Sequence, residues 1–334
     1  MAKIYAGWPY NLCQMGREVT GGTPVAATTV WRGPFGSWED DRQREVVEEE
    51  IGVLAQTSRV YDTWLGVKIP MPATVLTYEQ GPHVFEAGIM KATPTGAGPY
   101  TRAYAYSLAD TPNAIQPYTL EVGNKLALAD LKKLPYAFVS EFTLSGKAKA
   151  AWEISSMWNA QQASALAAFT AAIPAPTVKE AVFSSSKLYI DASGGTIGTT
   201  QVLGNFMAAQ IKVKTGIIPV PVGDGNLYYT ALKYTRPQVT FKFTYELEQD
   251  GATSRVATER AAYESKATQL FRIEVPGPSP RNLKIDIAGR YTKVGGYEKE
   301  GDGNTVVSFE GNGDYSSTDA LFFAITNINS VATM

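Results

Sequence analysis

The sequence contains an internal repeat. Residues 61–79 (YDTWLGVKIPMPATVLTYE) and 228–246 (YYTALKYTRPQVTFKFTYE) lie 167 positions apart and carry the same amino acid at seven of 19 positions. Each copy follows a predicted strand and precedes a helical pattern. A related strand comes next, YTLEV at 118–122 in one half and FRIEV at 271–275 in the other. A repeated order of elements is the mark of a duplicated unit, so we expect two similar units in tandem.

The length of the chain and a break in its pattern predict where these units end. A chain of 334 residues is long enough for about two domains of ordinary size. Residues 172–179 (AIPAPTVK) combine two prolines with small residues, a composition typical of linkers. We therefore predict an N-terminal arm at 1–38, a first β domain at 39–175 and a second β domain at 176–334.

Strand patterns dominate the sequence. Runs rich in Val, Ile, Thr, Tyr and Phe recur at short intervals between clusters of Gly, Pro, Asn and Asp, which is typical of an antiparallel all-β chain. The predicted strands are 45–56, 59–69, 118–122, 137–144, 148–158, 187–192, 210–222, 239–248, 270–275, 283–291, 305–311 and 321–327. Turn residues at 145–147 and 223–226 predict two hairpins.

Two segments have helical character instead. Side chains at helical spacing predict one helix within 252–269, and a shorter stretch at 78–90 predicts another. Each helix follows one copy of the repeat. The expected fold class is therefore all-β with a minor helical part, in two tandem β-sandwich or barrel domains, each flanked by a helix.

The composition excludes several classes of function. Lys and Arg total 30 and Asp and Glu total 32, so the net charge of −2 gives no general attraction to nucleic acid or to anionic membranes. No apolar run approaches the roughly 18 residues of a membrane helix, and the first ten residues do not resemble a secretion signal.

The chain has one cysteine, Cys13, and one histidine, His83. Neither an internal disulfide nor a Cys/His zinc cluster is therefore expected. We expect Cys13 to be a small buried apolar group and His83 to be a surface or capping residue. No catalytic, metal or cofactor site is predicted.

Four segments together resemble a known family. They are GREVTGGTPVAAT at 16–28, YTLEV at 118–122, FVSEFTLSG at 138–146 and LYIDASGGTI at 188–197. In this order they resemble the major tail tube proteins of long-tailed, siphovirus-type bacteriophages, in their tandem-domain form. The resemblance spans nearly the whole chain.

The resemblance implies a structural protein rather than an enzyme. It implies β-sandwich domains whose inner sheets close side by side into a ring, and rings that stack into a tube for viral DNA. Two domains per chain would form a homotrimer with pseudo-sixfold symmetry. The implied partners are further copies of the chain and the tape-measure, tail-tip and terminator proteins, with transient passage of double-stranded DNA, no specific binding to it and no membrane. The implied location is the virion tail, after synthesis and assembly in the host cytoplasm.

Electrostatics restricts the wall of such a tube. Duplex DNA carries about one charge per 1.7 Å, so a cationic wall would bind it and hold it. We therefore expect an acidic or neutral lumen, and we select Glu45, Glu48 and Glu50 in the first copy as candidates. The equivalent hairpin of the second copy carries Lys212 and Lys214, which are also lumen candidates. The alternative is that the glutamates only form a solvated strand edge that discourages aggregation.

Contacts between subunits require segments that project from the sandwich. The candidates are the arm at 1–38, hairpin tips near 56–58 and 216–226, and the tail at 327–334. The aromatic candidates in the arm are Trp8, Tyr10, Trp31, Phe35 and Trp38. We expect them to dock on a neighbouring subunit and expect the domains to fold without the arm; the alternative is that the arm packs across its own domain.

Two other functions remain open from the sequence. A carbohydrate-binding or adhesive β-sandwich would use Trp31, Trp64, Trp152 and Trp158 as platforms for sugar rings. A β-rich hydrolase would use Glu246 or Glu248, which alternate onto one face of a predicted strand.

Overall fold

The computed structural model describes residues 5–55, 59–248, 254–300 and 303–334. These residues form antiparallel strands with two α-helices, α1 (Gly81–Gly88) and α2 (Arg255–Glu264). Both helices lie within the predicted segments 78–90 and 252–269. The predicted fold class, all-β with a minor helical part, is confirmed.

The first half of the chain forms two connected layers. In hydrogen-bonding order its strands are β2 (Thr29–Val30), β1 (Asn11–Arg17), β8 (Tyr118–Asn124), β9 (Lys132–Lys147), β10 (Glu153–Ala160), β6 (Val67–Val75) and β3 (Glu39–Asp40). The first part of β9 pairs with β8 in an outer sheet, and its later part pairs with β10 in an inner sheet. The long strand β9 therefore joins the two layers.

The second half repeats this order of pairing. Its strands are β13 (Gln201–Val202), β12 (Lys187–Ala192), β18 (Gln269–Pro276), β19 (Asn282–Glu300), β20 (Asn304–Gly313), β17 (Gln238–Glu246) and β14 (Phe206–Lys214). β11 (Ser164–Ala165) adds to the outer part of β9, and β21 (Phe323–Asn329) adds to the same part of β19. Each of these strands of one half thus has a counterpart in the other.

The two inner sheets are continuous. Residues 208–214 of β14 pair antiparallel with residues 141–147 of β9. The order across the joined inner sheet is β3, β6, β10, β9, β14, β17, β20 and the later part of β19. A second link between the halves is β7 (Tyr100–Ala105), which belongs to the first half and pairs with β21 of the second.

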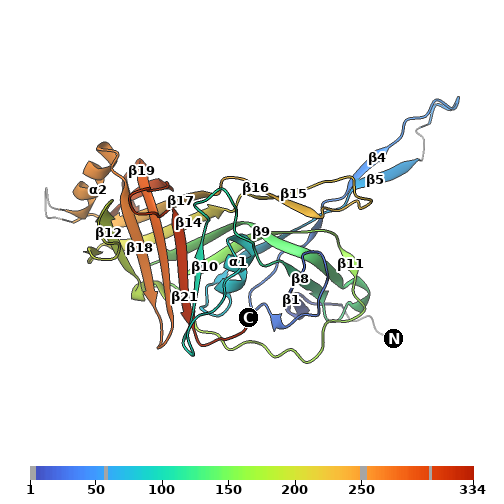
Figure 1. Cartoon of the computed structure of the whole chain (residues 1–334), viewed down its shortest axis with the longest axis horizontal. Helices are drawn as coiled ribbons and strands as arrows, with labels where there is room; N and C mark the ends of the chain where they lie inside the picture. Colours follow the sequence, from blue (N-terminus) through green and yellow to red (C-terminus); the bar gives the residue numbers. More distant parts are fainter. Residues whose placement is uncertain (1–4, 56–58, 249–253, 301–302) are drawn as a thin grey trace.

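The two helices occupy corresponding places but differ in burial. All eight residues of α1 are buried, whereas Val256 and Glu259 are the buried residues of α2. Figure 1 shows α1 in the middle of the molecule and α2 at the far end of the second half. The side chains of α1 are covered mainly by their own half, since Glu86 pairs with Arg17 of β1 and Phe85 packs against Phe142 of β9 and Tyr104 of β7. Helix α2 is less buried than α1.

Each half also carries a two-stranded hairpin outside the main sheets. β4 (Gln43–Val46) pairs with β5 (Val60–Trp64), and β15 (Ile217–Val220) pairs with β16 (Ala231–Tyr234). The first hairpin projects well away from the body of the molecule (Figure 1). The second is the hairpin predicted at 223–226. The long strand predicted at 45–56 is wrong, because β4 ends at Val46.

Several other predicted boundaries are shifted. The chain reverses at 148–150 rather than at 145–147, because β9 continues through Lys147. Tyr78 and Tyr245, which align in the sequence repeat, have different places: Tyr245 lies inside β17, whereas Tyr78 lies beyond the end of β6. The two halves therefore share the order of their strands, but residues that align in the sequence repeat do not always occupy equivalent positions in the structure.

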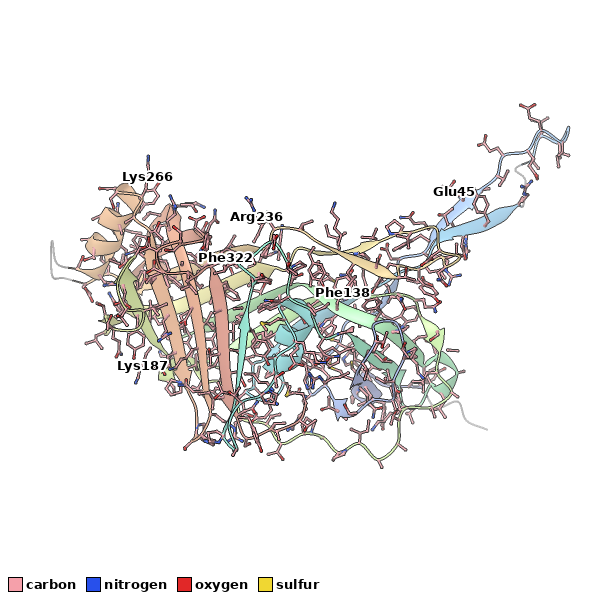
Figure 2. All side chains as sticks on the ribbon, viewed as in Figure 1. Glu45, Phe138, Lys187, Arg236, Lys266 and Phe322 are labelled. Atoms are coloured by element: carbon pink, nitrogen blue, oxygen red, sulfur yellow. The ribbon has the colours of Figure 1, made fainter. Side chains whose placement is uncertain are left out.

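The predicted N-terminal arm at 1–38 does not project, and this expectation is corrected. Residues 1–4 lie outside the described residues, but Asn11–Arg17 form β1, which pairs along its whole length with β8. Met15 is fully buried and Cys13 nearly so, which confirms the prediction for Cys13. The segment belongs to the first unit because its apolar residues complete the core between the layers (Figure 2 shows the dense packing of side chains).

We predict that Met15→Ala lowers the free energy of unfolding by about 2–5 kcal/mol, because it leaves a cavity in a closed core. Val19→Ala, at a site that is 93% exposed, is the matched control and should change stability by less than about 0.5 kcal/mol. Denaturant titration of both variants measures the difference. Equal, small effects would show that β1 does not contribute to the core.

Candidate functional site

The inner sheet presents one face that no other described layer of the chain covers, which we call the open face. On β14 the side chains alternate: Ala209, Ile211 and Val213 are buried in the core, whereas Gln210 and Lys214 are exposed. The same alternation runs across the neighbouring strands. The open face is therefore the polar side of a half-buried sheet.

Cross-strand rows show what this face is made of. One row runs through the paired residues Ser155, Thr143, Lys212, Thr240 and Asn312. The row beside it runs through Glu153, Ser145, Gln210, Lys242 and Glu310. Short hydroxyl and amide side chains alternate with single charges, and none of these ten residues is aromatic.

The charges on the open face largely neutralise one another. Lys212 Nζ lies 2.8 Å from Glu141 Oε1, and this ion pair crosses the junction between the halves. Glu310 forms ion pairs with Lys242 and Lys293, and in each pair the lysine Nζ lies 3.6 Å from a carboxylate oxygen. The sequence prediction found the lysines of β14 but missed Glu141 and Glu310, because their partnership depends on the register between strands far apart in the chain.

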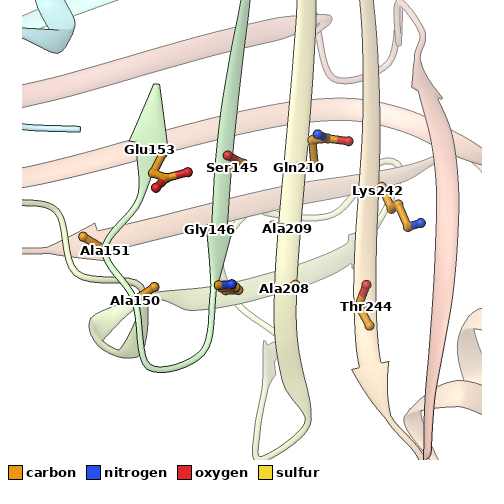
Figure 3. A pocket seen from close by; sticks show the side chains of 11 residues that line it. Ser145, Gly146, Ala150, Ala151, Glu153, Ala208, Ala209, Gln210, Lys242 and Thr244 are labelled. Atoms are coloured by element: carbon orange, nitrogen blue, oxygen red, sulfur yellow. The ribbon is translucent and has the colours of Figure 1, made fainter. Parts of the chain in front are cut away.

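The open face has a shallow hollow of about 330 Å³. Figure 3 shows the side chains that line it. Small residues line it, among them Gly146, Ala150 and Ala208, with Glu153 and Lys242 at its sides. Among the described residues no group of three His, Cys, Asp or Glu side chains is placed to hold a metal ion. The hollow is a shallow depression in the surface of the sheet. The carboxylate of Glu153 lies on β10 and the ammonium group of Lys242 on β17.

The structure separates the predicted lumen residues. Lys212 and Lys214 lie on the open face, as strand alternation indicates. Glu45 lies on β4 of the projecting hairpin, and Glu48 and Glu50 follow it in the same projection (Figure 2). The glutamates are therefore not brought together with the lysines. The segment 47–50 is not a strand, so Glu48 and Glu50 do not lie in the strand predicted at 45–56.

The predicted inter-subunit aromatics also divide into two groups. Trp8 and Tyr10 are 65% and 49% exposed. Trp31 and Phe35 are buried in the core of their own chain, so their predicted docking on a neighbour is wrong. Trp38 is half-buried, and the ammonium group of Lys132 lies over its ring, 5.7 Å from the ring centre, in a cation–π contact.

The remaining predicted projections have different outcomes. Residues 56–58 lie outside the described residues. The tail packs against its own chain, since the carbonyl groups of Val331 and Ala332 accept hydrogen bonds from Arg102 at 2.8 and 3.0 Å. Leu54, 108% exposed, and Ile51, 64% exposed, are large apolar side chains in the described part of the projecting hairpin and lie away from the core.

Residues considered for other functions are mostly buried. Trp31, Trp152 and Trp158 lie in the core, and Trp64 stacks on Tyr229, so these side chains do not form an exposed row of sugar platforms. The carboxylate of Glu248 accepts a hydrogen bond from the backbone N–H of Arg255 at the start of α2.

The expectation for His83 is wrong, because it is 3% exposed and its Nδ1 lies 3.0 Å from the hydroxyl of Tyr118. Burial, with the nearby charges of Arg17 and Arg102, lowers the pKa of His83 to about 3. The imidazole is therefore neutral at physiological pH.

A buried carboxylate anchors each helix. Glu86 on α1 pairs with Arg17 at 2.8 Å, and Glu259 on α2 pairs with Arg255 at 2.8 Å. Burial raises the pKa of both carboxyl groups, and the paired arginines oppose this effect. The two pairs differ in kind, because Arg17 lies on β1 and links it to α1, whereas Arg255 lies on α2 itself, one turn before Glu259.

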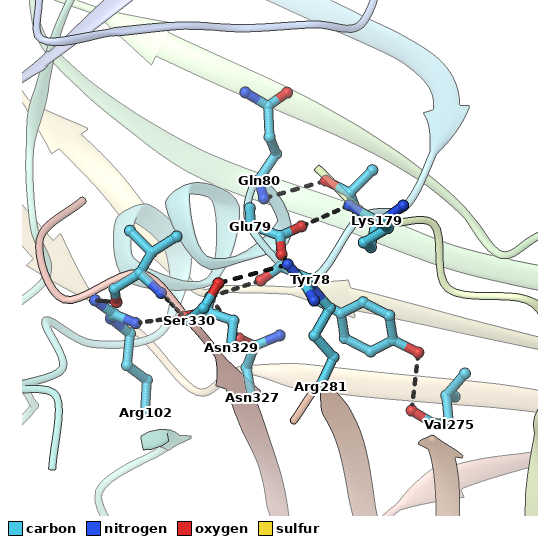
Figure 4. Close-up of polar contacts among 12 residues, drawn as sticks. Tyr78, Glu79, Gln80, Arg102, Lys179, Val275, Arg281, Asn327, Asn329 and Ser330 are labelled. Atoms are coloured by element: carbon cyan, nitrogen blue, oxygen red, sulfur yellow. Dashed lines mark hydrogen bonds and ion pairs between the residues drawn. The ribbon is translucent and has the colours of Figure 1, made fainter. Parts of the chain in front are cut away.

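A polar cluster ties the two halves together beside the sheet (Figure 4). Glu79 lies 2.5 Å from Arg281 of the second half and also accepts the backbone N–H of Lys179. The hydroxyl of Tyr78 donates to the carbonyl of Val275, and Asn329 donates to the carbonyl of Tyr78. The halves are therefore held as one rigid arrangement by buried polar contacts in addition to strand pairing.

Two comparisons with known proteins found no similar protein. A scan against models of protein families gives no match, and a search of curated protein sequences gives none. Within the described residues neither helix is long and apolar enough to cross a membrane.

We predict that Glu79→Gln lowers the free energy of unfolding by about 3–5 kcal/mol, because it leaves the largely buried Arg281 without its counter-charge. Arg44→Gln is the control, since it removes an ion pair to Asp62 from an arginine that is 56% exposed, and little change is expected there. Chemical denaturation of both variants tests this. A stable Glu79→Gln protein would mean that strand pairing alone fixes the halves.

Proposed function

We propose that this protein is the structural subunit of a bacteriophage tail tube, in which three copies form a ring of pseudo-sixfold symmetry. One observation carries the proposal: two units with the same strand order already share one continuous sheet through β9 and β14. A contact that joins unlike edges of similar units can be repeated by further copies, and it closes into a ring when the rotation between units allows.

The open face supports the role of tube wall. Lys212 pairs with Glu141 and Lys242 with Glu310 across strands, and most of the other side chains in these rows are short and polar. A wall of this kind offers few unpaired cations, so the release of counterions gives DNA little reason to adhere. Double-stranded DNA would then pass without specific binding.

The projecting hairpin supports stacking of rings. Val46, Ile51, Val53 and Leu54 are exposed there, apart from the body of the molecule. Burying such side chains against another subunit contributes roughly 25 cal/mol per Å² of apolar surface. In this proposal the protein belongs to the virion tail, with tape-measure, tail-tip and terminator proteins as partners. The alternative of a carbohydrate-binding or adhesive protein is less favoured, because most of its candidate platforms are buried.

We predict that the purified protein forms rings or hollow tubes at high concentration, visible by negative-stain electron microscopy. Mass photometry of the smallest closed species should give three copies. Discrete monomers at every concentration, together with binding to a glycan array, would contradict the proposal and favour the carbohydrate-binding alternative.

The charge balance of the open face gives a second prediction. Glu153→Lys with Gln210→Lys adds three positive charges per chain to the open face, because both residues lie there. Tubes of this variant should retain duplex DNA at low salt and protect it from nuclease, and high salt should release it. Glu180→Lys with Gln201→Lys adds the same charge elsewhere on the exposed surface. That control should bind DNA without protecting it; equal protection by both variants would remove the open face from the lumen.

A further inference from the structure

The inner sheet ends in two edges that lack a strand partner among the described residues. At one end, residues 290–300 of β19 pair with β20 on one side only. At the other end, β3 and the residues before it run along β6, with Gly36 N–H donating to the Pro70 carbonyl at 2.6 Å and Asp41 N–H donating to the Gly66 carbonyl at 2.8 Å. Unpaired edges are templates for another strand.

We propose that the β19 edge of one copy pairs antiparallel with the β3 edge of a second copy, in the register of the internal β9–β14 junction. This inference rests on the proposed ring and names the contact that closes it. The strand order supports it, because β19 is the counterpart of β9 and β3 is the counterpart of β14.

The internal junction predicts which residues face each other. Glu141 lies directly opposite Lys214 at this junction. Arg290 has the place of Glu141, because each is the first charged residue after its strand passes from the outer to the inner sheet. Glu39 has the place of Lys214, because each lies opposite the first open-face residue of the next strand, Lys68 for Glu39 and Gln238 for Lys214. In this register, Arg290 of one copy lies directly opposite Glu39 of the second copy.

The charges of the two edges are complementary. The β3 edge carries Glu39 and Asp40, both exposed, and Asp41 follows them. The β19 edge carries Arg290 and Lys293, which reach solvent while each also pairs within the chain, Arg290 with Asp314 at 2.7 Å and Lys293 with Glu310 at 3.6 Å. Opposite charges also face each other at the internal junction, where β9 carries the acidic residue and β14 carries the basic residues. At the proposed contact the signs are reversed, because the counterpart of β9 is basic and the counterpart of β14 is acidic. Opposite charges across paired strands favour one register over its neighbours.

Shape supports the same register. Tyr297, 68% exposed, lies on the β19 edge opposite Val307, which is fully buried, so its ring is directed to the core side of the sheet. Beside β3 lies a groove of about 180 Å³, lined by Trp8, Phe35 and Trp38 among others. The proposed pairing brings the ring of Tyr297 to this groove, where aromatic contacts would exclude water.

Cysteine cross-linking tests the register. Lys293 and Ser37 have the places of Thr143 and Lys212, which face each other at the internal junction. Directly opposed residues of paired strands are close enough for a disulfide. Under mild oxidation, Ser37→Cys with Lys293→Cys should give covalent dimers and trimers of the full chain, with no larger species. Native Cys13 is buried and does not interfere.

Two control pairs calibrate this experiment. Thr143→Cys with Lys212→Cys should form a disulfide within one chain, which shows that the geometry suffices. Ser37→Cys with Thr240→Cys should not cross-link, because Thr240 is in the middle of the sheet between β14 and β20. A ladder that continues beyond trimer would indicate an open filament and would contradict ring closure by this contact.

Charge reversal supplies an independent test. Glu39→Arg and Arg290→Glu should each lower the assembled fraction by roughly tenfold at low salt, and the double variant should recover most of it. Asp110→Arg, at an exposed position outside β3 and β19, should assemble as the parent does. Circular dichroism confirms that each monomer is folded.

The outcomes separate this inference from the proposed function. Rings that form without the designed disulfide between positions 37 and 293, and without response to charge reversal, would overturn the edge pairing and leave the tube function standing. A protein that never forms rings or tubes under any condition would overturn the proposed function itself. Rings in which the double reversal restores assembly and the designed disulfide stops at trimer would support both.

Discussion

Backbone pairing between β9 and β14 is the interaction on which the rest of the structure depends. It turns two sandwiches into one sheet, so the side chains of both halves share a single open face. A strand edge offers unpaired N–H and C=O groups, and leaving them unpaired away from water is costly. The chain satisfies this demand once internally, between residues 141–147 of β9 and 208–214 of β14, and the proposed pairing of β19 with β3 would satisfy it between molecules.

The two halves are alike in topology and unlike in what surrounds them. Residues 89–117 of the first half include β7, which extends the outer sheet of the second half and has no counterpart among the described residues of that half. Helix α1 is completely buried, and it is packed against β1, β8 and β9 of its own half and against the inserted β7. Helix α2 keeps the buried ion pair of Glu259 and Arg255 but is much less covered.

In the proposed tube, the open face would have to meet two demands, stability in water and free passage of DNA. A sheet exposed to water needs polar side chains, and charges are the most soluble of these, yet unpaired cations would bind DNA. Pairs such as Lys212 with Glu141 resolve the conflict, because each charge is satisfied at short range and the net field stays small. Surface ion pairs of this kind contribute little to folding stability, so their value here lies in the charge that they cancel.

The sequence by itself determined the all-β class, the two helices and the duplication, because alternation of side chains and turn residues are local signals. It also placed Lys212 and Lys214 on one face, since a strand of period two needs no partner to define its faces. Only the tertiary structure decided that Glu45, Glu48 and Glu50 leave the sheet on a hairpin, and that Trp31, Phe35 and His83 are buried. Burial and strand register depend on contacts between residues distant in the chain, and no local pattern records which distant strand will lie alongside.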